Sequence, residues 1–337
     1  MTRPPARRRY LVVAVVGFTL CWGSTGCITL NVFDGGPSAL TETVVFGEKG
    51  PKILMLEIDG VITESPDRGS WLSAGQESTV ARVREQLDAA RKERSLVAVL
   101  LRIDSPGGGA TASELVYREI LNFKKEKGVP VVAQLMGTAT SGGYYVAMAA
   151  DEVVAHPTTV TGSIGVIFLG INLSGLMEKL GIEDQTITGG RYKDTGSALR
   201  PMKPDEREQL QGIIDDLHAR FREVVVTGRP ELDAASVETL ADGRIYSARQ
   251  AVANGLVDRI ATLEETVEAL EERTGNEHTR VISYHRRREW RRNLYTKVQQ
   301  PGAPVISPVI RLDLGPLLGP FAYQGPGFHY LWWPGAQ

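Results

Sequence analysis

The chain has 337 residues, of which 42% are hydrophobic, so it has enough apolar side chains for one large or two modest folded domains. Its formal net charge of -2 is nearly neutral, and we therefore expect no nucleic-acid partner. Its two cysteines, Cys21 and Cys27, lie near the N-terminus, which excludes a disulfide or a cysteine-based metal site in the rest of the chain.

Residues 1–26 have the pattern of an export signal. Four arginines among the first nine residues precede an uncharged, mostly apolar stretch, and small residues follow at 23–26. These small residues resemble a bacterial lipobox, which would make Cys27 the lipidated first residue of the mature protein. An uncleaved signal anchor over Tyr10 to Phe33 and a twin-arginine export signal remain open alternatives. The lipidated cysteine and the signal anchor both predict a body outside the cytoplasm, attached to membrane lipid through the N-terminus.

The stretch from residue 27 to residue 50 is polar and contains glycine, as expected of a tether. From residue 51 onward, short apolar runs alternate with helical patterns. The apolar runs predict strands at Lys52–Ile58, Leu96–Ile103, Val129–Met136, Glu152–Ala155 and Ile164–Phe168. The helical patterns predict helices at Thr79–Arg94, Ala110–Lys127, from near Ser141, and at Ser174–Leu180, Asp205–Val226, Asp233–Leu240 and Ala248–Asn254.

This alternation is typical of crossover units on a parallel sheet, so the fold class predicted for residues 51–272 is α/β with additional C-terminal helices. Residues 273–337 are a predicted basic and Pro/Gly/aromatic extension. We expect its last part, from residue 301, to be poorly packed.

Two strings suggest a catalytic pair. Ser141 lies in TATSGGYYVA, whose glycines suit a tight strand-to-helix turn that exposes one side chain. Lys193 lies in the glycine-rich string TGGRYKDTGS. A serine hydroxyl is a weak nucleophile until a base takes its proton, and a lysine amine can be that base if burial lowers its pKa. Ser163, in VTGSIGVI, is the candidate for orienting the lysine, although a structural turn serine is almost as good an interpretation.

A third string, LRIDSPGGGA, predicts a strand that runs into three glycines and then a helix. Free backbone N–H groups at such a position stabilise anions. A phosphate-binding loop is disfavoured because no Gly-Lys-Ser/Thr follows. His156 is a weaker alternative base, and no metal-ligand spacing is present, so we predict no metal and no cofactor.

Together these strings resemble the bacterial signal peptide peptidase SppA family in its short, single-repeat form. The resemblance rests on LRIDSPGG, TSGGYYVA, TGSIGV, GRYK before Arg200, Met202, Pro204, Glu206 and Arg207, and the later ADGRIYSARQAVANGLVD. It covers roughly residues 51–262. It implies the crotonase/Clp-like fold of repeated ββα crossover units.

The resemblance also implies roles for individual residues. Ser141 would be the acyl-forming nucleophile, Lys193 the general base, and Ser163 the residue that orients the lysine. Backbone N–H groups of Gly108 and Gly142 would hold the oxyanion. The family forms ring or dome oligomers, so a homo-oligomer is expected, in which serine and lysine can come from adjacent copies.

The function predicted is a serine endopeptidase with a Ser-Lys dyad that degrades signal peptides or similar apolar peptides in the cell envelope. Two other functions remain open at this point. One is a crotonase-like acyl-thioester enzyme, which would use the glycine-rich loop without a serine nucleophile. The other is a non-catalytic scaffold at the membrane.

Overall fold

A computed structural model describes residues 39–66, 77–286, 293–295 and 328–332. The chain divides into two units, Met1–Ala39 and Leu40–Gln337, and the second contains the elements described below. The predicted export signal, Cys27 and most of the predicted C-terminal extension lie outside the described residues.

The strands are β1 Leu40–Phe46, β2 Lys52–Asp59, β3 Leu96–Ser105, β4 Gly107–Gly109, β5 Val131–Thr140, β6 Glu152–Ala155, β7 Val160–Gly162, β8 Ile167–Phe168, β9 Ile245–Ser247, β10 Arg259–Ile260, β11 Arg280–Arg286 and β12 Phe328–Leu331. The helices are α2 Thr79–Arg91, α3 Ala110–Lys127, α4 Gly142–Ala147, α5 Ser174–Leu180, α6 Pro204–Gly228, α7 Ala234–Leu240, α8 Ala248–Ala253 and α9 Leu263–Thr274. The predicted strands and helices from residue 52 to residue 155 agree with these elements to within a few residues.

Nine of the described strands form one sheet, and the α/β class predicted from the sequence is confirmed. Its main path runs β1-β11-β2-β3-β5-β6-β10, and β7 branches from β5. All neighbours from β11 to β10 are parallel, as is the β5–β7 pair. The carboxyl ends of β3, β5 and β7 therefore meet at one edge, where an open parallel sheet places its binding residues.

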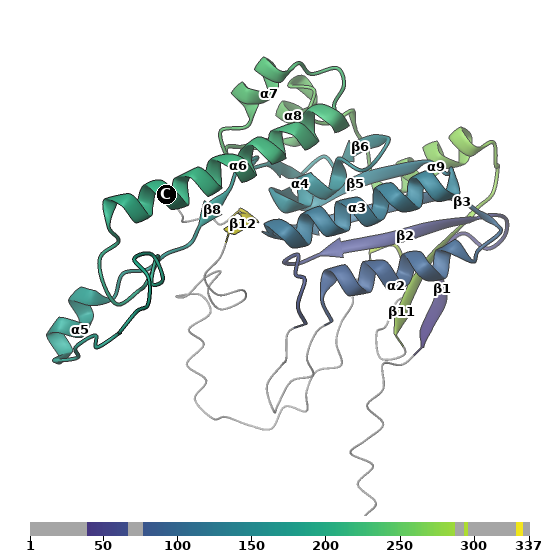
Figure 1. Cartoon of the computed structure of the whole chain (residues 1–337). Helices are drawn as coiled ribbons and strands as arrows, with labels where there is room; N and C mark the ends of the chain where they lie inside the picture. Colours follow the sequence, from purple (N-terminus) through teal and green to yellow (C-terminus); the bar gives the residue numbers. More distant parts are fainter. Residues whose placement is uncertain (1–38, 67–76, 287–292, 296–327, 333–337) are drawn as a thin grey trace, which may run out of the picture. The chain divides into compact units, whose positions relative to one another are not determined.

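Each face of the sheet buries its own core. Leu54, Leu56 and Ile58 of β2 join one hydrophobic cluster, whereas Ile53 and Met55 join another, because successive side chains of a strand point to opposite faces. Helices α2, α3 and α4 contribute to the first cluster and α9 to the second. Figure 1 shows α2 and α3 side by side along the sheet. The two cores fix the strand ends that carry the candidate residues.

Two stretches outside the predicted catalytic domain add strands to this sheet. β1 lies within residues 27–50, where a tether is expected, and pairs antiparallel with β11. β11, from the expected extension, inserts between β1 and β2. Within the described ranges, no helix combines the length and the apolar character needed to cross a membrane.

Candidate active site

The turn that carries Ser141 joins β5 to α4. Ser141 has φ 50° and ψ -117°, a conformation that residues with a side chain rarely adopt. Its backbone N–H donates to the Gly162 carbonyl at 2.8 Å, and its carbonyl accepts from Tyr145 N at 2.8 Å. Strained backbone of this kind is maintained only where the surroundings enforce it, and it is concentrated at functional sites.

Ser163 lies next to this turn. β5 and β7 are parallel neighbours in which Thr140 is paired with Gly162, so the next residue of each strand is one of the two predicted serines. Ser163 also has φ 50°, and within the described part of the chain no other non-glycine residue has a positive φ. Its N–H donates to the Arg244 carbonyl at 2.8 Å. The sheet register thus brings together two serines that are 22 positions apart in the sequence.

The predicted oxyanion amides also converge. A β-carbon placed on Gly142 would lie 3.1 Å from the amide nitrogen of Gly108 and 2.4 Å from the Ser113 hydroxyl, so only glycine fits there. The amides flanking Gly108 have other partners, because Gly107 N donates to Ser105 Oγ at 3.0 Å and Gly109 N to the Ile62 carbonyl at 3.0 Å. The Gly108 amide is the one that lies beside Gly142.

Lys193 lies in a turn of the segment that connects α5 to α6, and its side chain is exposed in the single chain. No hydrogen bond joins its amine to Ser141 or to Ser163, both of which are buried. Its backbone N–H donates to the Gly190 carbonyl at 3.2 Å. The chain by itself therefore assembles the serine side of the site and leaves the lysine facing solvent.

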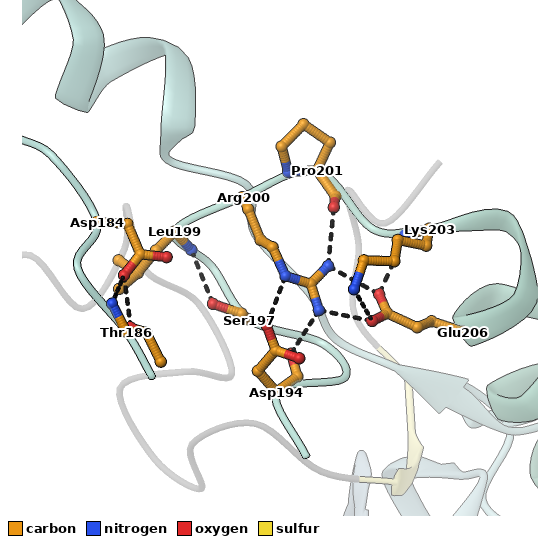
Figure 2. A network of polar contacts seen from close by, with 9 residues as sticks. All are labelled: Asp184, Thr186, Asp194, Ser197, Leu199, Arg200, Pro201, Lys203 and Glu206. Carbon is orange, nitrogen blue, oxygen red and sulfur yellow. Dashed lines mark hydrogen bonds and ion pairs between the residues drawn. The ribbon is translucent and has the colours of Figure 1, made fainter. Parts of the chain in front are cut away.

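An arginine clamp holds the turn that follows Lys193, and Figure 2 shows its contacts. Arg200 Nε donates to Asp194 Oδ2 at 2.6 Å, and its Nη atoms donate to Glu206 at 2.9 and 2.5 Å. Glu206 is buried at the start of α6, where it also accepts from the Lys203 N–H at 3.0 Å. The clamp therefore ties the residue next to Lys193 to the first turn of α6.

The clamp also determines the ionisation of Glu206. Hydrogen bonds from Arg200 lower the pKa of this carboxyl from 4.5 to about 2, despite its burial. Arg200 and Glu206 belong to a motif on which the family resemblance rests, but that resemblance implies no role for either residue. The signal in the sequence was the pair itself, an arginine six residues before a glutamate at a helix start.

A cluster of buried aromatic rings lies next to α4, and the sequence did not predict it. Tyr145 of α4 stacks on Tyr330 of β12 with ring centroids 5.1 Å apart, and Phe221 of α6 lies 4.9 Å from Tyr145. The Tyr145 hydroxyl donates to Glu114, and burial raises the pKa of this tyrosine. The paired tyrosines after Ser141 were visible in the sequence, but their partner 185 positions later was not.

His156, the alternative base, lies in the loop after β6. Its ring Nδ1 is 2.9 Å from the Thr158 hydroxyl, and no hydrogen bond links it to Ser141. Across the described ranges, no three metal-ligating side chains gather into a cluster.

Comparison with known proteins finds peptidases. Residues 123–277 match the family model described as peptidase family S49. A protein of Enterococcus faecium, provisionally named signal peptide peptidase SppA, is 36% identical over 254 residues, which are 75% of this chain and 73% of that protein. The chloroplastic serine protease SPPA of Arabidopsis thaliana is 35% identical over 201 residues, 59% of this chain and 29% of that protein. Among solved structures, the 1510-N membrane-bound stomatin-specific protease aligns with a TM-score of 0.42 at 16% identity, over 66% of this chain and 85% of that one.

The Arg200 clamp generates a prediction about pH. Because the Glu206 pKa is depressed on folding, its contribution to stability is fully present above pH 4.5 and is lost as pH falls towards about 2. We expect Glu206→Gln to lower the free energy of unfolding above pH 4.5, and this difference from wild type to shrink over that window. Urea unfolding at a series of pH values measures it, with the exposed Glu208→Gln of the same helix as the matched control. If the difference in the free energy of unfolding between Glu206→Gln and wild type stays constant from pH 4.5 to about 2, Arg200 does not stabilise the charged form of Glu206.

Proposed function

The chain belongs to peptidase family S49 and is a serine peptidase, and we propose that it is a membrane-associated endopeptidase of the cell envelope that cleaves signal peptides and similar apolar, extended peptides. The observation that carries this proposal is the strained turn at Ser141, which lies beside the Gly108 and Gly142 amides. Family membership favours this activity over the acyl-thioester enzyme that the glycine-rich loop alone would also permit.

In the proposed reaction, Ser141 Oγ attacks the carbonyl carbon of the peptide bond while its proton passes to the neutral amine of Lys193. The negative charge that develops on the carbonyl oxygen is stabilised by the N–H groups of Gly108 and Gly142. The protonated lysine then gives its proton to the leaving amine, and an ester remains on Ser141. Water hydrolyses this ester by the same sequence of proton transfers. Ser163 orients the lysine amine.

A neutral lysine requires surroundings with little water, and the single chain leaves Lys193 exposed. We propose that a neighbouring copy supplies these surroundings in a homo-oligomer. The segment around Lys193 supports this, because its large apolar side chains face solvent: Leu176, Leu180 and Ile182 are more than half exposed, and Ile187 is 98% exposed. Apolar surface gathered on one segment in this way marks interaction sites.

The N-terminus supplies the proposed membrane attachment, with lipid on Cys27 as the first candidate and a signal anchor as the second. A body tethered outside the cytoplasm would meet apolar peptides released at the membrane. Such peptides bind readily as an added strand, because backbone hydrogen bonds accept any sequence. The proposed reaction needs neither a metal nor an organic cofactor.

The dyad is tested first by alanine variants. We expect Ser141→Ala and Lys193→Ala each to lower peptide hydrolysis by at least about a thousandfold, because the nucleophile and its base act as one unit. Lys125→Ala, at an exposed position of α3 outside this segment, should keep wild-type activity. A fluorophosphonate probe should label wild type and not Ser141→Ala. Full turnover by Lys193→Ala would exclude the lysine as base.

Mixing the two inactive variants tests whether the dyad forms between copies. If Ser141 of one copy acts with Lys193 of the next, an equal mixture of Ser141→Ala and Lys193→Ala chains should regain about one quarter of wild-type activity, the chance that an intact serine meets an intact lysine. Native mass spectrometry of the mixture verifies that mixed oligomers have formed. Mixed oligomers without activity would place the dyad within one chain.

The oxyanion site is tested at Gly142. Its β-carbon would lie 2.4 Å from Ser113 Oγ and 3.1 Å from the Gly108 nitrogen, so Gly142→Ala must displace the amides. We expect kcat to fall by about a hundredfold or more, the usual cost of a lost oxyanion donor. Gly212→Ala on α6, where a β-carbon meets nothing within 4 Å, is the matched control. Unchanged kcat in a folded Gly142→Ala protein would exclude this pair of amides.

A further inference from the structure

Strand β9 supports the turn that carries Ser163. It pairs antiparallel with β7, in a register that places Gly162 opposite Ile245. The two paired residues are more than 80 positions apart in the sequence. Just before β9, the Arg244 carbonyl accepts a hydrogen bond from the Ser163 N–H at 2.8 Å. The backbone of Ser163 is therefore held from the side of β9.

The peptide unit between Gly162 and Ser163 connects the two serines of the site. A peptide unit is planar, so its C=O and N–H groups move together. The C=O group of this unit accepts from the Ser141 N–H at 2.8 Å, and its N–H group donates to the Arg244 carbonyl at 2.8 Å. Gly162 has φ 88°, a conformation that favours glycine. A rotation of this unit would therefore displace the backbones of Ser141 and Ser163 together.

The ring of Tyr246 lies against this peptide unit. A β-carbon on Gly162 would be 2.6 Å from Tyr246 Cδ2 and 3.1 Å from Cε2, so the ring leaves no room for a side chain there. Tyr246 is 6% exposed and belongs to the hydrophobic cluster that also contains the residues of α4. Its hydroxyl donates to the Leu240 carbonyl, at the end of α7, at 2.9 Å. Core packing and this hydrogen bond fix the ring, and the ring limits the movement of Gly162.

We propose that Tyr246 is a positioning residue for the peptidase reaction. Its ring prevents the Gly162–Ser163 peptide unit from rotating, and it thereby maintains Ser141 and Ser163 in the backbone conformation that the reaction uses. Both serines have φ 50°, and strained backbone relaxes when its surroundings stop enforcing it. The inference rests on the proposed function for the roles of the two serines. In this role Tyr246 acts through Gly162 and needs no contact with the substrate.

Steady-state kinetics of Tyr246 variants test this role. We expect Tyr246→Leu to lower kcat about tenfold or more and to leave KM nearly unchanged, because small displacements of the reacting groups slow the chemical step strongly. Tyr246→Phe keeps the ring against Gly162 and should recover nearly all of the lost kcat. Tyr246→Met is a second variant, because a flexible apolar side chain fills the core volume without a rigid ring. It should lose kcat as Tyr246→Leu does.

Tyr284→Leu is the matched control. Tyr284 is also 6% exposed in the same cluster, and β2, β3 and β5 separate its strand β11 from β7. We expect this control to lower the melting temperature as Tyr246→Leu does and to leave kcat unchanged. Equal losses of kcat in the two leucine variants would assign the effect to stability and overturn the inference. Wild-type kcat in folded Tyr246→Leu and Tyr246→Met, or a loss in Tyr246→Phe as large as in Tyr246→Leu, would overturn it too.

Fluorophosphonate labelling separates this inference from the proposed function. We expect the probe to label Tyr246→Leu more slowly than wild type, by the same factor as the loss in kcat, and Tyr246→Phe at nearly the wild-type rate. A single labelling rate for wild type and all three Tyr246 variants, with Ser141→Ala unlabelled, refutes the positioning role and leaves the proposed function standing. Absence of labelling from wild type refutes both.

Discussion

The parallel register of β3, β5 and β7 is the constraint on which the site depends. It pairs Thr140 with Gly162. The residues that follow them, Ser141 and Ser163, therefore lie side by side, each at φ 50°. A non-glycine residue in this region costs on the order of 1–3 kcal/mol. Two such residues persist because both faces of the sheet bury large apolar cores, and the strand ends cannot relax without disturbing them. The fold thus maintains a locally unfavourable turn at Ser141, next to the backbone amide of Gly142.

Local patterns explain why much of this was predictable from the sequence. The strands β2, β3 and β5 are continuous apolar runs because both their faces are buried, and the glycines around Ser141 and Gly108 indicate tight turns with free amides. The short strands β7, β9 and β10 were not predicted, because two or three residues are too few to show the alternation of apolar and polar side chains. β1 and β11 were not predicted for another reason. They pair with each other across more than 230 positions of sequence, and β11 also pairs with the distant β2, so neither strand is evident from its local sequence.

The two predicted dyad residues differ in their surroundings, and this difference is informative. Ser141 is buried by elements of its own chain, whereas Lys193 lies on a segment whose apolar side chains face solvent. Burial of a lysine could not be inferred from its neighbours in sequence, because it depends on what covers the segment. The chain itself does fix the orientation of the turn next to Lys193. Arg200 joins Asp194 to the buried Glu206, so contacts within the chain fix the turn next to Lys193.

The C-terminal strand shows that composition alone can mislead about packing. Residues rich in proline, glycine and aromatic side chains suggested poor packing, yet Phe328, Tyr330 and Trp332 alternate as they would in a strand. Its partners β4 and β8 are only three and two residues long, so few backbone bonds hold it. The Tyr330 ring also packs against Tyr145 and Phe221, which are distant in the sequence, and no local pattern could have predicted these contacts.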